Sequence, residues 1–517
     1  MKKQLVLLLF SAVYLLLANQ ARAEHYFVKT DGDNNHTGLA ESTAWRTISH
    51  ATSRVVPGDT VHVKAGNYGN ENVVMSVDGT AENPIVFSGY TTNPDDQPDL
   101  NWSYPDNTDF NPDVMPLLDG NDRSTGIGIT LHSRQYVIIK NFQIQNYQSG
   151  VYGWHAEHVI VQNIFTRNMG DINADYSGRG IVFGSLADHN TIKDCVSFNA
   201  AAEGIAIFGD HNAVENSQVY CDDNSTGYRS NTDYYIIVSG NYNRVTGSYA
   251  ERVGDLEHVG HGIGVKGDCV YNTFSHCTAK NFSGGFYVRH RGSKYNLFED
   301  CTALNSNIGI LVRDGASENT FSRCRTDGGS MGVAFLDTAE DEGAQGAGSD
   351  NLFKNCIFEN SYTMISFNDY DRNSDTYGNI FINCTFNDGE YLFAVERDNH
   401  DNKLINSIVS NVRNFKTGPY DLNFSFSHSL FNDNGFSTPT GTDIISADPL
   451  FINAPEGNYH LLPGSAGIDA GTSASAPTED FDRLSRPKGA GYDIGAYEYP
   501  QTSILQFLPA LIKAGKE

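Results

Sequence analysis

The stretch Asn272-Thr273-Phe274-Ser275-His276-Cys277 begins a pattern that returns along much of the chain. The motif Asn-x-x-x-x-Cys recurs from Asn190 to Asn379, and degenerate copies without the cysteine begin at Asn212, Asn243 and Asn402. Successive asparagines are 22 to 32 residues apart. A period of this length with variable loops and no helical pattern is typical of a stacked solenoid of strands. The sequence therefore predicts an all-β fold, a right-handed parallel β-helix.

The two residues that define the motif predict what lies inside the coils. An inward asparagine can bond to the asparagine of the next coil, and a small apolar cysteine can fill the core. Six of the eight cysteines share this register, so we expect a stack of thiols rather than disulfides, whose geometry adjacent sheet positions seldom allow. Cys221 and Cys269 fall outside the register, and the sequence leaves open whether they pair.

The first residues have the features of an export signal. Lys2 and Lys3 precede an apolar stretch from Leu5 to Leu17, and Ala21-Arg22-Ala23 fits a cleavage site. The apolar stretch is short for a membrane span. We therefore expect a signal peptide at 1–23, a secreted or periplasmic protein, and no membrane span once the signal is removed.

The charge of the chain narrows the class of partner. The net charge of −27 becomes −30 when the three cations of the signal are removed. Such an acidic protein is a poor partner for nucleic acid or for an anionic membrane. It also makes a local group of cations more informative, because the rest of the surface repels a polyanion.

The chain divides into an expected order of segments. After the signal, residues 24–126 should form an amino-terminal cap and first coils, with an amphipathic cap helix between Trp45 and Val55. Residues 127–412 should form the coils proper. Residues 413–517 should form an irregular crossing and closing segment. We expect one continuous solenoid that is a monomer.

A second repeat places cations on the coils. Gly262-Ile263-Gly264-Val265-Lys266 returns as Gly285-Phe286-Tyr287-Val288-Arg289 and as Gly309-Ile310-Leu311-Val312-Arg313. With the period of two of a strand, the valines point inward and Lys266, Arg289 and Arg313 point outward together with Tyr287. Neighbouring coils lie about 4.8 Å apart, so the cations should form a column that suits an anionic partner. The alternative is that outward Lys and Arg only keep a sheet soluble.

Long intervals on either side of this column predict the walls of a cleft. The loop before Lys266 carries Tyr235, His258 and His261, and the loop after Arg313 carries several acidic residues. We expect Arg313, His261 and Tyr235 to bind substrate. Tyr287, beside Arg289, offers a flat surface for a sugar ring or a phenol that donates a proton. The histidines have the alternative of being loop structure.

The coils from Gly262 to His290 also resemble the active-site coils of the chondroitinase B and alginate lyase family, β-helix enzymes that cut uronate polysaccharides by β-elimination. The resemblance implies Lys266 as the proton-abstracting base and Arg289 as the group near the leaving oxygen, with His290 matching the histidine that often follows. That family holds Ca²⁺ with acidic residues shortly before the lysine. Here those positions hold Val259 and His261, so only Glu257 and Asp255, further upstream, are candidate metal ligands.

The chemistry explains why such an enzyme needs cations. The proton α to a uronate carboxylate becomes removable only when a metal or an arginine offsets the carboxylate charge. A lysine among other cations has its ammonium form disfavoured and so becomes a base. Arginine is a reluctant acid, which keeps Tyr287 and His290 as alternative proton donors.

Three other functions remain open on the sequence. A uronate C5-epimerase would use the same proton abstraction. A glycoside hydrolase on this fold needs two carboxylates, for which Asp255, Glu257, Asp314 and Asp337 are the candidates. A non-catalytic carbohydrate-binding solenoid would cut no bond. The sequence favours a secreted polysaccharide lyase acting on an anionic, uronate-containing polymer.

Overall fold

The computed structural model describes residues 23–94, 96–171, 177–222, 232–253, 260–338, 346–369 and 376–500. The predicted signal peptide, apart from Ala23, lies outside these ranges, as do Asp255, Glu257 and His258. In the described ranges no helix has the length and apolar character needed to cross a membrane.

The fold is a right-handed parallel β-helix, as predicted, and its residues fall into two compact units. The first unit comprises residues up to Gly170 together with Gly180–Val196, and the second comprises Asp171–Arg179 together with Ser197 onward. The chain passes from one unit to the other after Gly170 and again within the strands β10 (Arg179–Phe183) and β12 (Val196–Ala200).

The first unit begins with a cap that contains very little helix. The expected cap helix between Trp45 and Val55 is a single turn, α2 (Ile48–Ala51), which follows the 3-10 turn η1 (Glu41–Thr43). Trp45, Ile48 and Val55 are nonetheless buried, so the apolar spacing was correct although the helix is short. The parallel strands of this unit are β1 (His25–Val28), which precedes η1, and then β2 (Thr60–Lys64), β3 (Val73–Val74), β4 (Ile85–Tyr90), β5 (Leu117–Asp119), β6 (Ile127–Thr130), β7 (Val137–Gln145), β8 (Ser149–Gly153), β9 (Ile160–Met169) and β11 (Thr191–Lys193).

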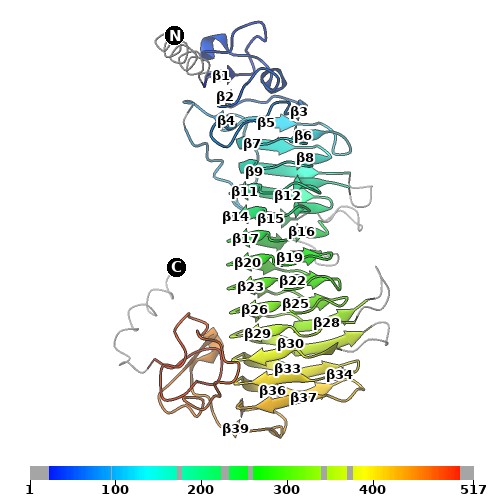
Figure 1. The fold of residues 1–517 in the computed structure, drawn as a ribbon, viewed down its shortest axis with the longest axis vertical. Coiled ribbons are helices and arrows are strands. Elements are labelled where there is room, and N and C mark those ends of the chain that lie inside the picture. The colour runs from blue at the N-terminus through cyan, green and yellow to red at the C-terminus, as the bar shows by residue number, and fades with distance from the viewer. Residues whose placement is uncertain are drawn as a thin grey trace, which may run out of the picture. The chain divides into compact units, whose positions relative to one another are not determined.

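The second unit stacks its coils as three strand rows, which Figure 1 shows in green to orange. The first row is β13 (Glu203–Ile207), β16 (Tyr234–Val238), β19 (His261–Lys266), β22 (Gly284–Arg289), β25 (Ile308–Arg313) and β28 (Met331–Asp337). The second row is β14 (Ala213–Glu215), β17 (Arg244–Thr246), β20 (Thr273–Ser275), β23 (Leu297–Glu299), β26 (Thr320–Ser322), β29 (Leu352–Lys354), β32 (Ile380–Ile382), β35 (Asn402–Ile405) and β37 (Phe424–Ser427).

The third row is β15 (Gln218–Cys221), β18 (Tyr249–Arg252), β21 (Thr278–Lys280), β24 (Thr302–Leu304), β27 (Arg325–Asp327), β30 (Ile357–Asp369), β33 (Thr385–Val395), β36 (Ile408–Thr417), β38 (Leu430–Asn432) and β39 (Ile445–Ser446). The strand β30 also pairs with β28 of the first row, because it continues around the corner. The segment from residue 413 onward, expected to be irregular, thus begins with further paired strands. Two short pairs complete the unit: β31 (Thr376–Tyr377) with β34 (Asn399–His400), and β40 (Phe451–Asn453) with β41 (Asn458–Leu461) around the 3-10 turn η2 (Ala454–Glu456).

The repeated asparagines and cysteines stack inside these coils as predicted. The side-chain oxygen of Asn296 accepts hydrogen bonds from the backbone and side-chain nitrogens of Asn272, both at 3.0 Å, and the next asparagine does the same for Asn296. Each bond satisfies a polar group that would otherwise be buried without a partner. No disulfide joins any of the eight cysteines, all of which lie in described ranges, so Cys221 and Cys269 do not pair.

Candidate functional site

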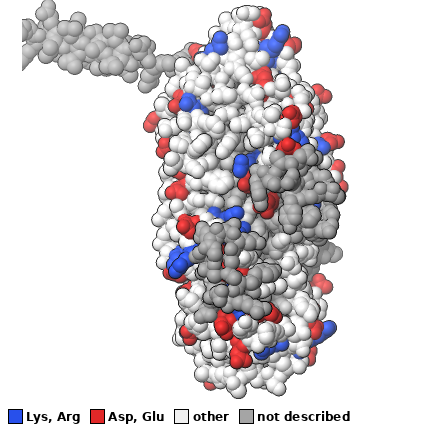
Figure 2. Space-filling view, turned by 90° about the vertical axis from the view of Figure 1, so that its right-hand side faces the viewer, with Lys and Arg blue, Asp and Glu red and all other residues white. Residues whose placement is uncertain are grey.

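The three cations lie in register on one sheet. Lys266 at the end of β19 pairs with Arg289 on β22, and Arg289 pairs with Arg313 on β25. The predicted column is confirmed in this respect. Figure 2 views the molecule from the right-hand side of Figure 1, and there the described Lys and Arg side chains lie among Asp and Glu side chains rather than forming one basic surface.

The alternation of side chains along this sheet is interrupted by one residue. A Cβ added to Gly262 would contact the ring of Phe282 and the methyl group of Ala279, so this position faces the core. The next residue, Ile263, is fully buried in the core as well. Two consecutive residues therefore face inward at the corner of each coil. On β16 the register places Tyr235 at this inward position and Tyr234 at the outward position before it.

This interruption corrects the prediction that Tyr235 binds substrate. Its ring is buried and packs edge-on against Phe282, with 4.5 Å between the ring centroids. The residue that joins the cations is its neighbour Tyr234. Strict alternation along the strand would not place two consecutive side chains inward, and no feature of the sequence predicts the corner at which this occurs.

Tyr287 is also not the exposed platform that parity predicted. It is 0 % exposed, and its hydroxyl donates to the backbone carbonyl of Ile236 at 3.2 Å, two coils away. The ring reaches that carbonyl by lying across Gly264, where an added Cβ would be 2.9 Å from Cγ of Tyr287. The bare glycine thus accommodates a tyrosine of the chain itself, and burial raises the pKa of that tyrosine well above its ordinary value.

Both arginines of the column are buried and held by polar partners. Arg289 is 4 % exposed, and its Nη1 donates to the hydroxyl of Tyr234 at 2.6 Å. The carboxylate of Asp314 lies 3.5 Å from Nη2 of Arg289 and 2.8 Å from Nε of Arg313. Arg313 also donates to the hydroxyl of Thr338. Asp314 therefore bridges the two guanidinium groups and offsets their mutual repulsion.

Lys266 differs from the two arginines because its side chain is only partly buried. Its ammonium lies 5.0 Å from the centre of the Tyr234 ring, within the range of a cation–π contact. Tyr234 thus has Lys266 over its ring and Arg289 on its hydroxyl. Burial raises the pKa of the Tyr234 phenol above its ordinary value, although the arginine acts in the opposite direction.

Two further titratable groups face the cations. Burial, helped by Arg289, Arg313 and Lys266, lowers the pKa of His261 to about 3, so its imidazole is neutral at ordinary pH. Its ring lies 5.2 Å from the rings of both Tyr234 and Tyr287. Burial raises the pKa of Asp233 above its ordinary range, and the same three cations partly offset this rise.

A second carboxyl lies one coil earlier. Glu203 pairs with Tyr234 in the sheet register and forms an ion pair with Arg179. Burial raises the pKa of Glu203, and Asp233 adds to that rise while Arg179 and Lys266 lower it. We call the set of Glu203, Asp233, Tyr234, His261, Lys266, Arg289, Arg313 and Asp314 the cation cluster.

The remaining predicted residues are less closely placed. His290 follows β22 in a left-handed turn with a φ of 80°, and its backbone nitrogen donates to the carbonyl of Arg313 at 3.2 Å. Asp255 and Glu257 lie outside the described residues, so the structure places no metal ligand there. Within the described ranges no group of three or more His, Cys, Asp or Glu side chains is gathered to hold a metal ion.

Sequence reasoning missed Asp233, Tyr234 and Glu203 as members of the cluster. Asp233 and Tyr234 lie in the long interval before Lys266, at the start of β16, and no feature of the sequence favoured Tyr234 over Tyr235 as a site residue. The signal that could have found them is the strand register, which sets Tyr234 directly beside His261. Asp314 was considered only as a hydrolase carboxylate, whereas in the structure it bridges two arginines.

Residues 26–203 match the family described as Pel9A-like, right handed beta helix region. The matched residues cover the first coils and end before Asp233, so the match includes only Glu203 of the cation cluster. No curated protein matches the chain.

Solved structures of similar fold include enzymes of more than one class. A GH136 lacto-N-biosidase from Eubacterium ramulus is 13% identical, with 82% of this chain and 68% of that chain covered and a TM-score of 0.44. Pectate lyase Pel9A is 13% identical, with coverage of 93% and 98% and a TM-score of 0.32. The PL6 family alginate lyase AlyGC is 12% identical, with coverage of 86% and 55% and a TM-score of 0.47. At these identities the likeness concerns the fold and not the reaction.

Proposed function

We propose that the protein is a polysaccharide lyase that cleaves a uronate-containing polymer by β-elimination at the cation cluster. The observation that carries this proposal is the stacking of Lys266, Arg289 and Arg313 on consecutive strands with a phenol, Tyr234, between two of them. In so acidic a chain, a group of three neighbouring cations suits a substrate that brings its own negative charge.

Lys266 is the proposed base. Its neutral amine takes the proton α to the uronate carboxyl, the electrons of that C–H bond form the C4–C5 double bond, and the bond from C4 to the leaving oxygen breaks. The pKa of His261 is lowered mainly by burial, and Arg289 and Arg313 lower it further, so the two guanidinium groups add a positive potential at this position. Arg289, which is paired with Lys266 in the sheet register, disfavours the ammonium form of Lys266, whereas the carboxyl groups of Asp233 and Glu203 act in the opposite direction.

The leaving oxygen needs a proton, and Tyr234 is the proposed donor. Its hydroxyl is held by Nη1 of Arg289, and a guanidinium at that distance stabilises the phenolate that forms when the proton leaves. Arg289 then serves to position and stabilise Tyr234, while Asp314 keeps Arg289 in place. This assignment differs from the one that the family resemblance implies, in which Arg289 itself stands at the leaving group. His290 remains an alternative donor.

Calcium remains part of the proposal only through residues outside the described ranges. If Asp255 and Glu257 hold the ion, it supplies the charge that neutralises the substrate carboxylate. If they do not, the arginines must supply it. Activity measured before and after exhaustive treatment with a chelator, and after Ca²⁺ is returned, separates the two cases.

A glycoside hydrolase is the second candidate, because two carboxyls of the cluster have raised pKa values. Asp233 and Glu203 lie on neighbouring coils, and a buried carboxyl that holds its proton can serve as a general acid. The two reactions leave different products. A lyase forms a conjugated double bond that absorbs in the ultraviolet, whereas a hydrolase forms new reducing ends without that absorbance.

The experiment is a panel of uronate polymers, among them alginate, polygalacturonate and glycosaminoglycans, assayed for both products. We expect ultraviolet absorbance to rise together with reducing ends on at least one polymer. Reducing ends without absorbance would replace the lyase with the hydrolase. No product from any polymer would exclude both.

A further inference from the structure

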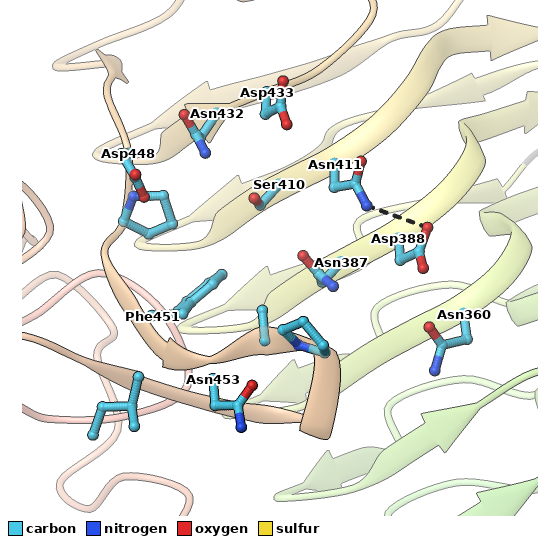
Figure 3. A pocket seen from close by; sticks show the side chains of 14 residues that line it. Asn360, Asn387, Asp388, Ser410, Asn411, Asn432, Asp433, Asp448, Phe451 and Asn453 are labelled. Atoms are coloured by element: carbon cyan, nitrogen blue, oxygen red, sulfur yellow. Dashed lines mark hydrogen bonds between the residues drawn. The ribbon is translucent and has the colours of Figure 1, made fainter.

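A polar cleft lies at the carboxyl-terminal side of the second unit, between the third strand row and the closing segment (Figure 3). Its volume is about 650 Å³. Its strand wall belongs to β30, β33, β36 and β38, and its other wall is formed by residues 448–455, which include β40 and the start of η2. None of its lining residues belongs to the cation cluster.

The strand wall presents one polar residue from each coil. Asn387 pairs with Ser410, and Ser410 pairs with Asn432, so three polar side chains stand in register about 4.8 Å apart. The residues that follow them in the chain turn the corner in the left-handed conformation that Asn and Asp tolerate best. These corner residues are Asp388, Asn411 and Asp433. Asn360, in the coil before them, has the same left-handed conformation.

The opposite wall combines flat apolar groups with polar ones. Phe451 points toward the strand row, and Pro449 and Asn453 also line the cleft on the side of the closing segment (Figure 3). The hairpin of β40 and β41 is held against the coils by Tyr459, which packs with Ile357, Ala496 and Tyr497. The wall is therefore fixed by a core of its own and does not depend on a ligand.

Two buried polar residues of the strand wall, Ser410 and Asn387, line the cleft and have hydrogen-bonding capacity left for a ligand. Ser410 is 6 % exposed, and none of the described residues accepts from or donates to its hydroxyl. Asn387 is 7 % exposed; its amide nitrogen donates to the hydroxyl of Tyr459 at 3.3 Å, and that hydroxyl in turn donates to Glu359. This chain of bonds fixes the Asn387 amide and leaves its carbonyl oxygen for a donor in the cleft.

The charge of the lining selects against the substrate of the cation cluster. Asp388, Asp433 and Asp448 line the cleft, and the described lining contains no Lys or Arg. A uronate would meet repulsion here. A metal ion is also disfavoured, because the described carboxylates are not gathered into a group that could hold one.

We propose that this cleft binds a neutral saccharide chain. Carboxylate and amide oxygens accept from sugar hydroxyls, the amide nitrogens of Asn432 and Asn453 donate to them, and Phe451 with the prolines covers the apolar face of a ring. The polar residues repeat once per coil, a spacing of the same order as one sugar unit in an extended chain. The cleft would hold a polymer that accompanies the charged substrate.

The test is affinity electrophoresis of the full chain in native gels that contain xylan, mixed-linkage β-glucan, galactomannan, alginate or polygalacturonate. We expect at least one neutral polymer to retard the protein. Ser410→Ala and Asn453→Ala should each weaken that retardation about tenfold, as loss of hydrogen bonds to a ligand does. Asn453 is exposed and in a 3-10 cap without a side-chain bond, so its replacement leaves the fold intact.

Two controls keep this test separate from the proposed lyase. Ser425→Ala changes an exposed serine outside the cleft and should leave retardation unchanged. Lys266→Ala should also leave the neutral-polymer retardation unchanged, while the cleft variants should keep any action on uronate polymers. The proposal is overturned if no neutral polymer retards the protein, or if the cleft variants bind as the unaltered protein does. Retardation that Lys266→Ala abolishes would assign the binding to the cation cluster instead.

Discussion

The cation cluster and the carboxyl-terminal cleft are built in opposite ways. The cluster is centred on one sheet, on which three consecutive coils each add a cation in the same register position. The cleft joins strands β33, β36 and β38 to a hairpin that follows them in the chain but lies across their outer face. The cation cluster therefore results from a repeated motif, whereas the cleft depends on where a non-repeating segment packs against the coils.

The two regions also differ in how they treat charge. The cluster buries Arg289 and Arg313 and bridges them with Asp314, which leaves Lys266 as the most accessible of the three cations. The cleft has carboxylates and amides and, in its described lining, no cation. If both proposals hold, this acidic solenoid binds an anionic sugar at one surface and a neutral sugar at another.

The largest expected effect on this comparison comes from Lys266→Ala. Removal of the proposed base should lower kcat on the uronate polymer about 10²- to 10⁴-fold, the range typical of a general base. Retardation by neutral polymers should not change. Formation of the ultraviolet-absorbing product measures the first effect, and Lys280→Ala, which removes a partly buried lysine from the third strand row, is the matched control. An active Lys266→Ala enzyme would contradict the assignment.

Tyr234→Phe tests the proton donor with its neighbour as the control. The change removes the hydroxyl that accepts from Arg289 but keeps the ring under Lys266, so kcat should fall about 10- to 100-fold while the fold is kept. Tyr235→Phe alters the adjacent core tyrosine and should leave kcat within about twofold if the corner directs it inward. Equal losses in the two variants, measured with matched circular dichroism spectra, would remove Tyr234 from the mechanism.

Gly264→Ala tests the packing that distinguishes the cluster from an open groove. A Cβ there would lie 2.0 Å from the carbonyl oxygen of Tyr287, so we expect a loss of about 1–3 kcal/mol in the free energy of unfolding. Gly184→Ala meets only ordinary contacts of 3.4 Å or more and should be nearly neutral. Denaturant titration of both variants measures the difference. If Gly264→Ala is as stable as Gly184→Ala, Tyr287 does not lie over residue 264.

The smallest expected effect is the pH dependence that His261 adds to stability. Its pKa is lowered from the ordinary value of about 6.5 to about 3 in the folded protein, so the unfolded chain takes up the proton first as the pH falls. The stability that the neutral ring contributes is therefore present above pH 6.5 and is lost progressively below it. His261→Gln should lower the slope of Tm against pH between pH 6.5 and 4. Parallel slopes for the two proteins would show that His261 is not held neutral.

Much of the fold could be predicted because a solenoid repeats its chemistry. Each Asn-x-x-x-x-Cys motif predicts the same local structure, so an ambiguous assignment in one coil is resolved by the other coils. The cap helix at Ile48–Ala51 was overestimated because an amphipathic stretch outside the repeat has no such support. The register of Lys266, Arg289 and Arg313 followed from the same repetition.

The sequence by itself thus determined the coil, its asparagine and cysteine stacks and the alignment of three cations, because each depends on residues a fixed interval apart. Only the tertiary structure decided that Tyr234 and not Tyr235 joins the cations, since the corner of the coil turns two consecutive side chains inward. It also decided that Tyr287 fills the space over Gly264 and that a closing hairpin makes a cleft. These depend on contacts between coils and between distant segments, which no local spacing encodes.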